Sequence, residues 1–373
     1  MSAAATLETI GEIEVAEGLP HPMHHGRWAK VENGVSRLSQ MWFVFKPNDP
    51  RETEEALGYL RRADMHLFYL PQWLWQGPGL YQVKRDFWPR GVADLRAFSD
   101  RLRAEGILLG IHTGSAGIAM GDPQYGRPVP HPQLAGWGTG RLAQAGAPGE
   151  TTLLFQPDPG VQAPVIDPRQ IHGTRPPVYN RTWSGNWLQV GDEVIQVGAF
   201  EATDTPLWRL TGCRRGANGT HAASHPAGTT VKGLLVSYGS CFTPDVDTPL
   251  FNETADALAK LVNDALVARI SFDALEMSDY PGRWAMNRFM TRAFNGFDHQ
   301  VACESSSGVP QYEWHISSYQ NVGEGMHTLP RAYFEGYLAH NCRVANDSFL
   351  PAALGAFTFR LDGPAQLASS PAD

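Results

Sequence analysis

The stretch VADLRAFSDRLRAEGILLGIH, residues 92–112, decides the fold. Apolar residues recur three and seven positions after Leu95, which predicts an amphipathic helix over Val92–Ala104. A Glu-Gly pair ends this helix, and the apolar run Ile107–His112 that follows predicts a buried strand. A helix followed closely by a buried strand is the repeating unit of a parallel β/α protein.

The same unit recurs on both sides of this stretch. Further strands are expected at Gln40–Phe45, His66–Leu70, Leu234–Tyr238, Arg269–Leu275, His299–Glu304, Tyr312–Ile316 and Leu354–Arg360. Further helices are expected at Arg51–Ala63, Pro249–Ala268, Trp284–Phe294 and Pro330–Val344. Eight parallel strands with intervening helices predict an α/β fold, a (β/α)8 TIM-like barrel.

The rhythm breaks after the third strand. Residues 113–233 are rich in Gly, Pro and Thr, and from about residue 185 to 232 they alternate between apolar and polar, with Gly/Asn turns. This pattern is typical of short antiparallel strands. We therefore expect a small all-β insertion at 113–233, between a first barrel part at 1–112 and a second at 234–373. Its GDEVI…RGANGT block resembles β modules that recur in phage-structural and carbohydrate-active proteins.

Composition narrows the class of partner. The net charge is −8 and no Lys/Arg run occurs, which disfavours a nucleic-acid partner. The N-terminus lacks the apolar core of a signal peptide, and no apolar stretch approaches the ~20 residues of a membrane helix, so we expect a cytoplasmic location by default, or a secreted or periplasmic one if the chain is a trimmed piece. The four cysteines are widely spaced and predict neither a zinc site nor a disulfide framework. The sequence leaves the oligomeric state open.

Catalytic groups of such barrels lie where the strands end at their carboxyl side. Alternation in RISFDALE and HQVACES turns Ile270 and Cys303 toward the helices, and leaves Asp273 and Glu304 facing the interior. Neighbouring strands lie about 4.8 Å apart, so the two carboxylates can come within about 5–6 Å, the separation of a retaining glycosidase pair. Glu276, at the exit of the same strand, is the competing acid.

The other interpretation of these carboxylates is structural. Asp273 and Glu276 could pair with Arg269, Arg283 or Arg288 as salt bridges. Because carboxylates follow two consecutive strands, the catalytic interpretation is favoured over this alternative.

Several further residues are candidates for substrate binding. His112 ends the third strand and suits a hydrogen bond to a sugar hydroxyl. Trp73, Trp75 and Tyr81 follow the second strand and could stack on a sugar ring, although loop packing explains them as well. His315 and Tyr319 lie near another strand end and could serve as base and proton donor, as in a lyase.

Neither a metal nor a cofactor is predicted. The HPMHH segment (His21, His24, His25) lacks helical i, i+4 spacing and a nearby carboxylate ligand. The Gly-rich segment GTGRLAQAG lies in the insertion, outside the strand–turn–helix context of a nucleotide-binding loop.

Two segments resemble the α-galactosidase (melibiase)-like barrel glycoside hydrolases. GVADLRAFSDRLRAEGILLGIHTGSAG is similar to a helix and strand of that superfamily, and RISFDALEM to its strand that ends in the nucleophilic Asp. The resemblance covers about residues 43–112 and 258–304, and it implies a nucleophilic role for Asp273. Ser271 stands where the family usually has Lys, and no Asp matches the family's acid after HQVACESSS.

The leading hypothesis is a retaining glycoside hydrolase that cleaves an oligo- or polysaccharide. Asp273 would be the nucleophile, and Glu304 or Glu276 the acid/base. The first alternative is a polysaccharide lyase acting on uronate-containing glycans through His315 and Tyr319. The second is a non-catalytic carbohydrate-binding protein. The sugar and the linkage stay open.

Overall fold

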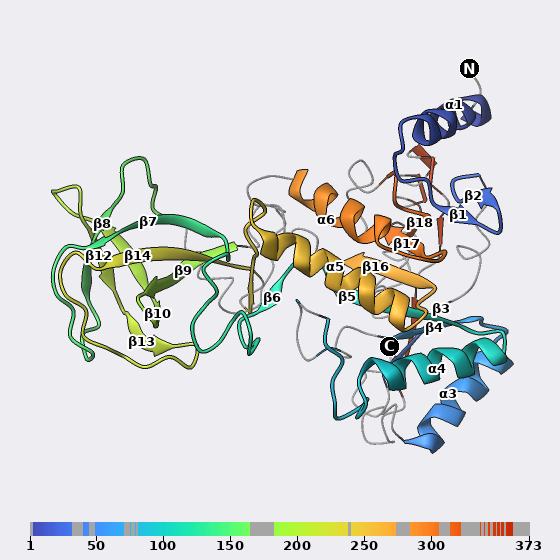
Figure 1. Cartoon of the computed structure of the whole chain (residues 1–373), viewed down its shortest axis with the longest axis horizontal. Helices are drawn as coiled ribbons and strands as arrows, with labels where there is room; N and C mark the ends of the chain where they lie inside the picture. The colour runs from blue at the N-terminus through green and yellow to red at the C-terminus, as the bar shows by residue number, and fades with distance from the viewer. Residues whose placement is uncertain are drawn as a thin grey trace.

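The computed structural model describes two sheets with their covering helices (Figure 1). It covers residues 3–31, 40–44, 49–70, 75, 79, 81–164, 183–237, 240–273, 284–305 and 314–321, with scattered positions between 336 and 360. Of the helices in these ranges, none has the length and apolarity that crossing a bilayer requires.

One sheet is parallel throughout. Its strands are β3 (Gln40–Val44), β4 (Leu67–Leu70), β5 (Leu108–Gly114), β16 (Arg269–Asp273), β17 (Ala302–Ser305), β18 (Tyr319–Asn321), β19 (Ala352–Ala353) and β20 (Ala356–Arg360). They are hydrogen-bonded in the order β19-β18-β17-β16-β5-β4-β3-β20, and each neighbouring pair is parallel. From β3 to β19, strands that follow one another in this sheet are therefore neighbours in space.

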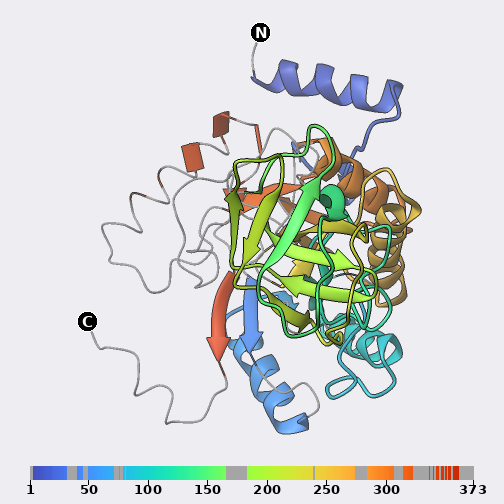
Figure 2. The same cartoon turned by 90° about the vertical axis from the view of Figure 1, so that its left-hand side faces the viewer.

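The two ends of this row lie close together along the chain. β19 pairs with β18, whereas β20 pairs with β3 at the opposite end (Figure 2). Only residues 354 and 355 separate β19 from β20. Three Cα–Cα steps span at most about 11 Å, so the row must curl until its ends lie within that reach. No pairing between β19 and β20 occurs in the described residues.

Four helices pack against this sheet. They are α3 (Pro50–Arg62), α4 (Val92–Ala104), α5 (Pro249–Asp264) and α6 (Trp284–Asn295). α3 begins where the side chain of Asp49 accepts a hydrogen bond from the backbone N–H of Arg51, and Pro50 supplies a fixed φ at the first position. The predicted helix positions Leu95, Phe98 and Leu102 are buried.

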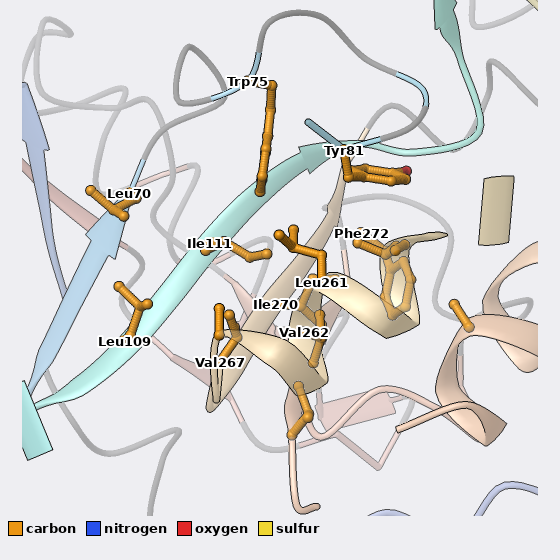
Figure 3. Packing of buried hydrophobic residues seen from close by; sticks show 14 of the residues in the cluster. Leu70, Trp75, Tyr81, Leu109, Ile111, Leu261, Val262, Val267, Ile270 and Phe272 are labelled. Carbon is orange, nitrogen blue, oxygen red and sulfur yellow. The ribbon is translucent and has the colours of Figure 1, made fainter. Parts of the chain in front are cut away.

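The outward face of the strands forms the main core with these helices. Leu109, Ile111, Ile270 and Phe272 belong to one buried cluster with apolar residues of α4, α5 and α6 (Figure 3). Cys303 belongs to the same cluster, so the predicted alternation of β16 and β17 is confirmed. The intervening residues of each strand therefore face the opposite side, which has a different composition.

The second sheet is antiparallel. Its strands are β6 (Ile118–Ala119), β7 (Gly136–Leu142), β8 (Leu153–Pro157), β9 (Trp183–Val190), β10 (Glu193–Gln196), β11 (Ala199–Ala202), β12 (Trp208–Thr211), β13 (Arg214–Ala217), β14 (Thr230–Ser237) and β15 (Cys241–Phe242). The main order is β11-β12-β8-β7-β14-β9-β10-β13. A buried cluster that includes Leu134, Phe242 and Leu250 joins this unit to α5.

A buried carboxylate holds the turns of the antiparallel unit. Glu193 accepts hydrogen bonds from Arg215 Nε and Nη2 at 2.8 Å each and from His225 Nε2 at 2.7 Å. The backbone N–H groups of Gly216 and Ala223 also donate to it, at 2.8 and 3.1 Å. Burial alone would raise the pKa of Glu193, but the donors outweigh it and lower the pKa to about 2.

The N-terminal segment forms a structure that the sequence did not predict. It consists of α1 (Ala3–Ala16), β1 (Met23–His24) and β2 (Arg27–Trp28). Glu14 of α1 is fully buried and is hydrogen-bonded to the Nδ1 atoms of His21 and His315, at 2.7 Å each. Lys30 is also buried and donates to the carbonyl oxygen of Ser317. These contacts attach the segment beside β18.

Two predicted strands differ in the structure. Leu234–Tyr238, counted above as a barrel strand, overlaps β14 and pairs in the antiparallel sheet with β7 and β9. The described part of Tyr312–Ile316 is a turn, and the strand begins at Tyr319. The apolar character of both segments reflects burial, which does not distinguish a sheet partner from a packed turn. The predicted helix Pro330–Val344 lies largely outside the described residues.

Candidate active site

Asp273 is the last residue of β16, at the carboxyl end of the strand. Its Cα pairs with that of Gly114, the last residue of β5. The backbone of Asp273 therefore lies at the carboxyl edge of the parallel sheet. Glu276 and Trp73 lie outside the described residues.

The register aligns four polar residues one step below this edge. Ser271 pairs with His112 on one side and with Glu304 on the other, and Glu304 pairs with Tyr319. These four positions form one row across β5, β16, β17 and β18, on the face opposite the helices. His112, Ser271 and Glu304 are 3%, 1% and 1% exposed, so these three members of the row are removed from water.

The same register sets the separation of the two predicted catalytic carboxylates. Asp273 lies two residues beyond Ser271, the partner of Glu304. A two-residue rise of about 6.6 Å and a strand spacing of about 4.8 Å give a diagonal of about 8 Å between the two Cα atoms. Glu304 is therefore the deeper of the two positions.

Glu304 forms an ion pair with Arg269, and both side chains are buried. Arg269 begins β16 and lies one step below the polar row. Its guanidinium carbon lies 4.0 Å from the centroid of the Tyr69 ring, a cation–π geometry. An Arg in contact stabilises the ionised form of a carboxylate, so Glu304 is poorly suited to donate a proton.

A glycine of β5, the strand between β4 and β16, makes the contact between Arg269 and Tyr69 possible. Gly110 pairs with both Tyr69 and Arg269, on β4 and β16 respectively. A Cβ at Gly110 would lie 3.2 Å from Arg269 Cδ and 3.3 Å from Tyr69 Cδ2. The missing side chain therefore lets the ring and the guanidinium meet across β5.

The contact between Arg269 and Tyr69 was not predicted from the sequence, which suggested Arg269 only as a structural partner of Asp273 or Glu276. The signal was present in RISFD, where Arg269 alternates in phase with Ser271 and Asp273 and so shares their face. Gly110 is likewise in phase with His112. That Gly110 lies between Tyr69 and Arg269 could not be predicted without the register of the three strands.

The aromatic residues after β4 are core residues. Trp75 and Tyr81 are each 3% exposed, and their ring centroids lie 5.9 Å apart in an edge-to-face contact. Trp75 Nε1 donates to the carbonyl oxygen of His112 at 2.9 Å. Burial raises the pKa of Tyr81. Both rings thus belong to the buried cluster, beside the end of β5 (Figure 3), and do not form a platform open to a sugar, because a buried ring has no free face.

His315 and Tyr319 occupy different positions relative to the edge. His315 lies in the turn before β18, and its Nδ1 contacts Glu14 of the N-terminal segment. Tyr319 opens β18 within the polar row. His21, predicted to lie outside any metal site, contacts the same Glu14. In the described part of the chain, no group of three or more His, Cys, Asp or Glu side chains is arranged to hold a metal ion.

A family model described as "Rcc01698-like, C-terminal" matches residues 180–232, the stretch that contains Glu193, Arg215 and His225. No curated protein sequence matches the chain.

Solved structures similar to the chain include two α-galactosidases and an α-amylase. An α-galactosidase from Lactobacillus brevis is 9% identical, with a TM-score of 0.43, over 90% of this chain and 39% of its own. An α-galactosidase from Thermus thermophilus is 10% identical, with a TM-score of 0.40, over 91% and 60%. An α-amylase from Geobacillus thermoleovorans is 9% identical, with a TM-score of 0.38, over 76% and 51%. The chain thus spans between 39% and 60% of the length of these three proteins.

Proposed function

We propose that this protein is a carbohydrate-active hydrolase that cleaves a glycosidic bond at the carboxyl edge of its parallel sheet. The observation that carries the proposal is the register. It puts Asp273 at the end of β16, directly above the row of His112, Ser271, Glu304 and Tyr319, of which the first three are buried. A carboxylate at this edge, backed by polar groups, is the arrangement that barrel hydrolases use.

In this proposal the strands also close into a (β/α) barrel. The support is the short link between β19 and β20, which pair with opposite ends of the row. Closure would turn the polar row into a lining of the interior, and the carboxyl ends of the strands into its mouth. Measured backbone amide protection of β19 and β20 would test closure, because these are the end strands of the row and an open sheet leaves one edge of each exposed.

The proposed mechanism is a double displacement. The ionised carboxylate of Asp273 attacks the anomeric carbon, the glycosidic C–O bond breaks, and the leaving oxygen takes a proton from an acid. Water then attacks the glycosyl ester, gives its proton back to the same group, and releases the sugar. Each cycle therefore restores both carboxyl groups.

The acid must hold a proton at the start of the cycle. Because Arg269 is paired with Glu304, we assign the acid role to Glu276 and give Glu304 the role of a fixed negative charge below the site. This choice between the two acids proposed from the sequence is tested by Glu276→Gln and Glu304→Gln. Loss of turnover on glycosides with poor leaving groups, with retained turnover on activated aryl glycosides, marks the acid.

The main experiment uses Asp273→Asn against a panel of aryl glycosides and natural polysaccharides. We expect a loss of kcat of at least about a thousandfold on any glycoside that the native chain cleaves, since removal of a nucleophile is rarely compensated. In Asp273→Gly, added azide should restore turnover and give a glycosyl azide.

The matched control is Asp100→Asn, an exposed carboxylate of α4 paired with Arg96. It should leave turnover and stability unchanged. Unchanged turnover in Asp273→Asn, or a native chain that cleaves no member of the panel, would overturn the proposal.

A further inference from the structure

A polar groove lies between α5 and α6, outside the candidate active site. Its volume is about 640 Å³, within the range of ligand sites, and it is lined by side chains from both helices. Asn252 and Asp256 line it from α5, and Asn287, Arg288, Thr291 and Arg292 from α6. Amide, hydroxyl, carboxylate and guanidinium groups together can donate to and accept from a ligand rich in hydroxyl groups.

The groove carries a net positive charge in a chain whose net charge is −8. Arg292 makes a bidentate pair with Asp256, with Nε–Oδ1 and Nη2–Oδ2 distances of 2.7 and 2.6 Å. Arg288 contacts Asn252 Oδ1 at 3.5 Å and forms no ion pair with a described carboxylate. The Arg288 guanidinium is therefore positioned to bind an anionic group.

An exposed aromatic residue lies on α6 one turn before the residues that line the groove. Trp284 is 49% exposed, one of few large apolar side chains in the described residues with this exposure. It lies three and four positions before Asn287 and Arg288, so it shares their face of α6. An indole ring with a free face packs against the apolar side of a sugar ring.

The helices run in the same direction, which places Trp284 at one end of the groove. Arg288 contacts Asn252, and Arg292 contacts Asp256, so positions on both helices advance together. α6 begins with Trp284 and follows β16 in the chain. In a parallel β/α unit, the amino end of a helix lies toward the carboxyl edge of the preceding strand. Trp284 is therefore at the end of the groove nearer Asp273.

We propose that the α5–α6 groove is a binding site for an acidic polysaccharide, with Trp284 stacking on a sugar ring and Arg288 binding its carboxylate. This inference rests on the proposed function in one respect: a polymer bound in the groove would be held near the carboxyl edge, where we propose that cleavage occurs. Binding in the groove requires no catalysis and is measured separately.

The experiment is titration calorimetry of the full chain with tetragalacturonate, with maltotetraose as the neutral counterpart and inorganic phosphate as the bare anion. Measurements are made in the native chain and in Asp273→Asn. We expect tetragalacturonate to bind both equally, and more weakly at high salt. Trp284→Ala and Arg288→Gln should each weaken binding by about tenfold or more.

The control variants are Phe349→Ala, an exposed aromatic residue elsewhere, and Arg96→Gln, an exposed Arg of α4. They should bind as the native chain does. The proposal is overturned if tetragalacturonate does not bind, if maltotetraose binds equally well, if phosphate competes at equal concentration, or if the Trp284→Ala/Arg288→Gln variant keeps full affinity. Failure in this titration with intact glycoside turnover removes the groove site alone. Binding without turnover removes only the proposed hydrolase.

Discussion

Each of the two sheets contains a buried carboxylate bound to an Arg, and the two arrangements differ. In the antiparallel unit, Glu193 accepts hydrogen bonds from the side chains of Arg215 and His225 and from two backbone N–H groups. All of these donors lie within residues 215–225. In the parallel unit, Glu304 pairs with Arg269 from a neighbouring strand, and the Arg packs on the ring of Tyr69. The first is held by side-chain and backbone donors together, the second by side chains brought together by register.

Glu193 and Glu304 differ in where their charge lies: Glu193 lies within the antiparallel fold, whereas Glu304 lies next to the candidate site. Glu193 has donors on both oxygens, and its pKa is lowered to about 2, as expected for a carboxylate whose charge is fully used in folding. Glu304 lies in a row with His112 and Ser271, directly below the strand edge where Asp273 ends β16. Its charge therefore acts on the candidate site as well as on stability.

The largest effect is expected from Arg269→Met. This change leaves Glu304 buried without its cation, and should lower the free energy of unfolding by about 3–5 kcal/mol. The paired change Arg269→Met/Glu304→Leu removes both charges and should recover most of that loss. Denaturant unfolding followed by tryptophan fluorescence measures both. A single variant as stable as the native chain would show that the pair contributes nothing to the fold.

Glu193→Gln should have a smaller effect, about 1.5–3 kcal/mol, because the amide keeps some of the hydrogen bonds. The pKa of Glu193 is lower in the folded chain than its ordinary 4.5, so its stabilisation is present above pH 4.5 and is lost as pH falls through about 2. The native chain and the variant should therefore differ in thermal stability at neutral pH and converge toward pH 2. A gap that stays constant over this interval would contradict the assignment of the charge.

Gly110→Ala should have the smallest effect, about 1 kcal/mol, since the new methyl group meets Arg269 and Tyr69 at 3.2 and 3.3 Å. Its informative readout is the proposed turnover, which should fall because the guanidinium shifts beneath Glu304. The control is Gly149→Ala in the antiparallel unit, where a Cβ meets nothing within 4 Å. Equal stability and equal turnover of Gly110→Ala and Gly149→Ala would mean that neither property requires the absence of a side chain at Gly110.

Much of the parallel unit could be predicted from local pattern. The helix at Val92–Ala104 has the predicted bounds, and the strand predicted at Arg269–Leu275 is observed through Asp273. Apolar segments that could belong to either sheet were harder to assign from the sequence. LLVSY at Leu234–Tyr238 is apolar enough for either sheet, and only its observed pairing with β7 and β9 assigns it to the antiparallel one. The docking of α1 through Glu14 had no signal, because its partner His315 lies 301 positions away.

The sequence by itself determined which residues face the helices and which face away, because a strand alternates with a period of two and a helix with a period near 3.6. It thereby put Asp273 and Glu304 on the same face of consecutive strands. Only the tertiary structure decided that Glu304 pairs with Arg269, that Arg269 meets the Tyr69 ring across Gly110, and that Trp75 and Tyr81 are buried. Those outcomes depend on the register between strands far apart in the chain and on what packs over a ring, which no local pattern encodes.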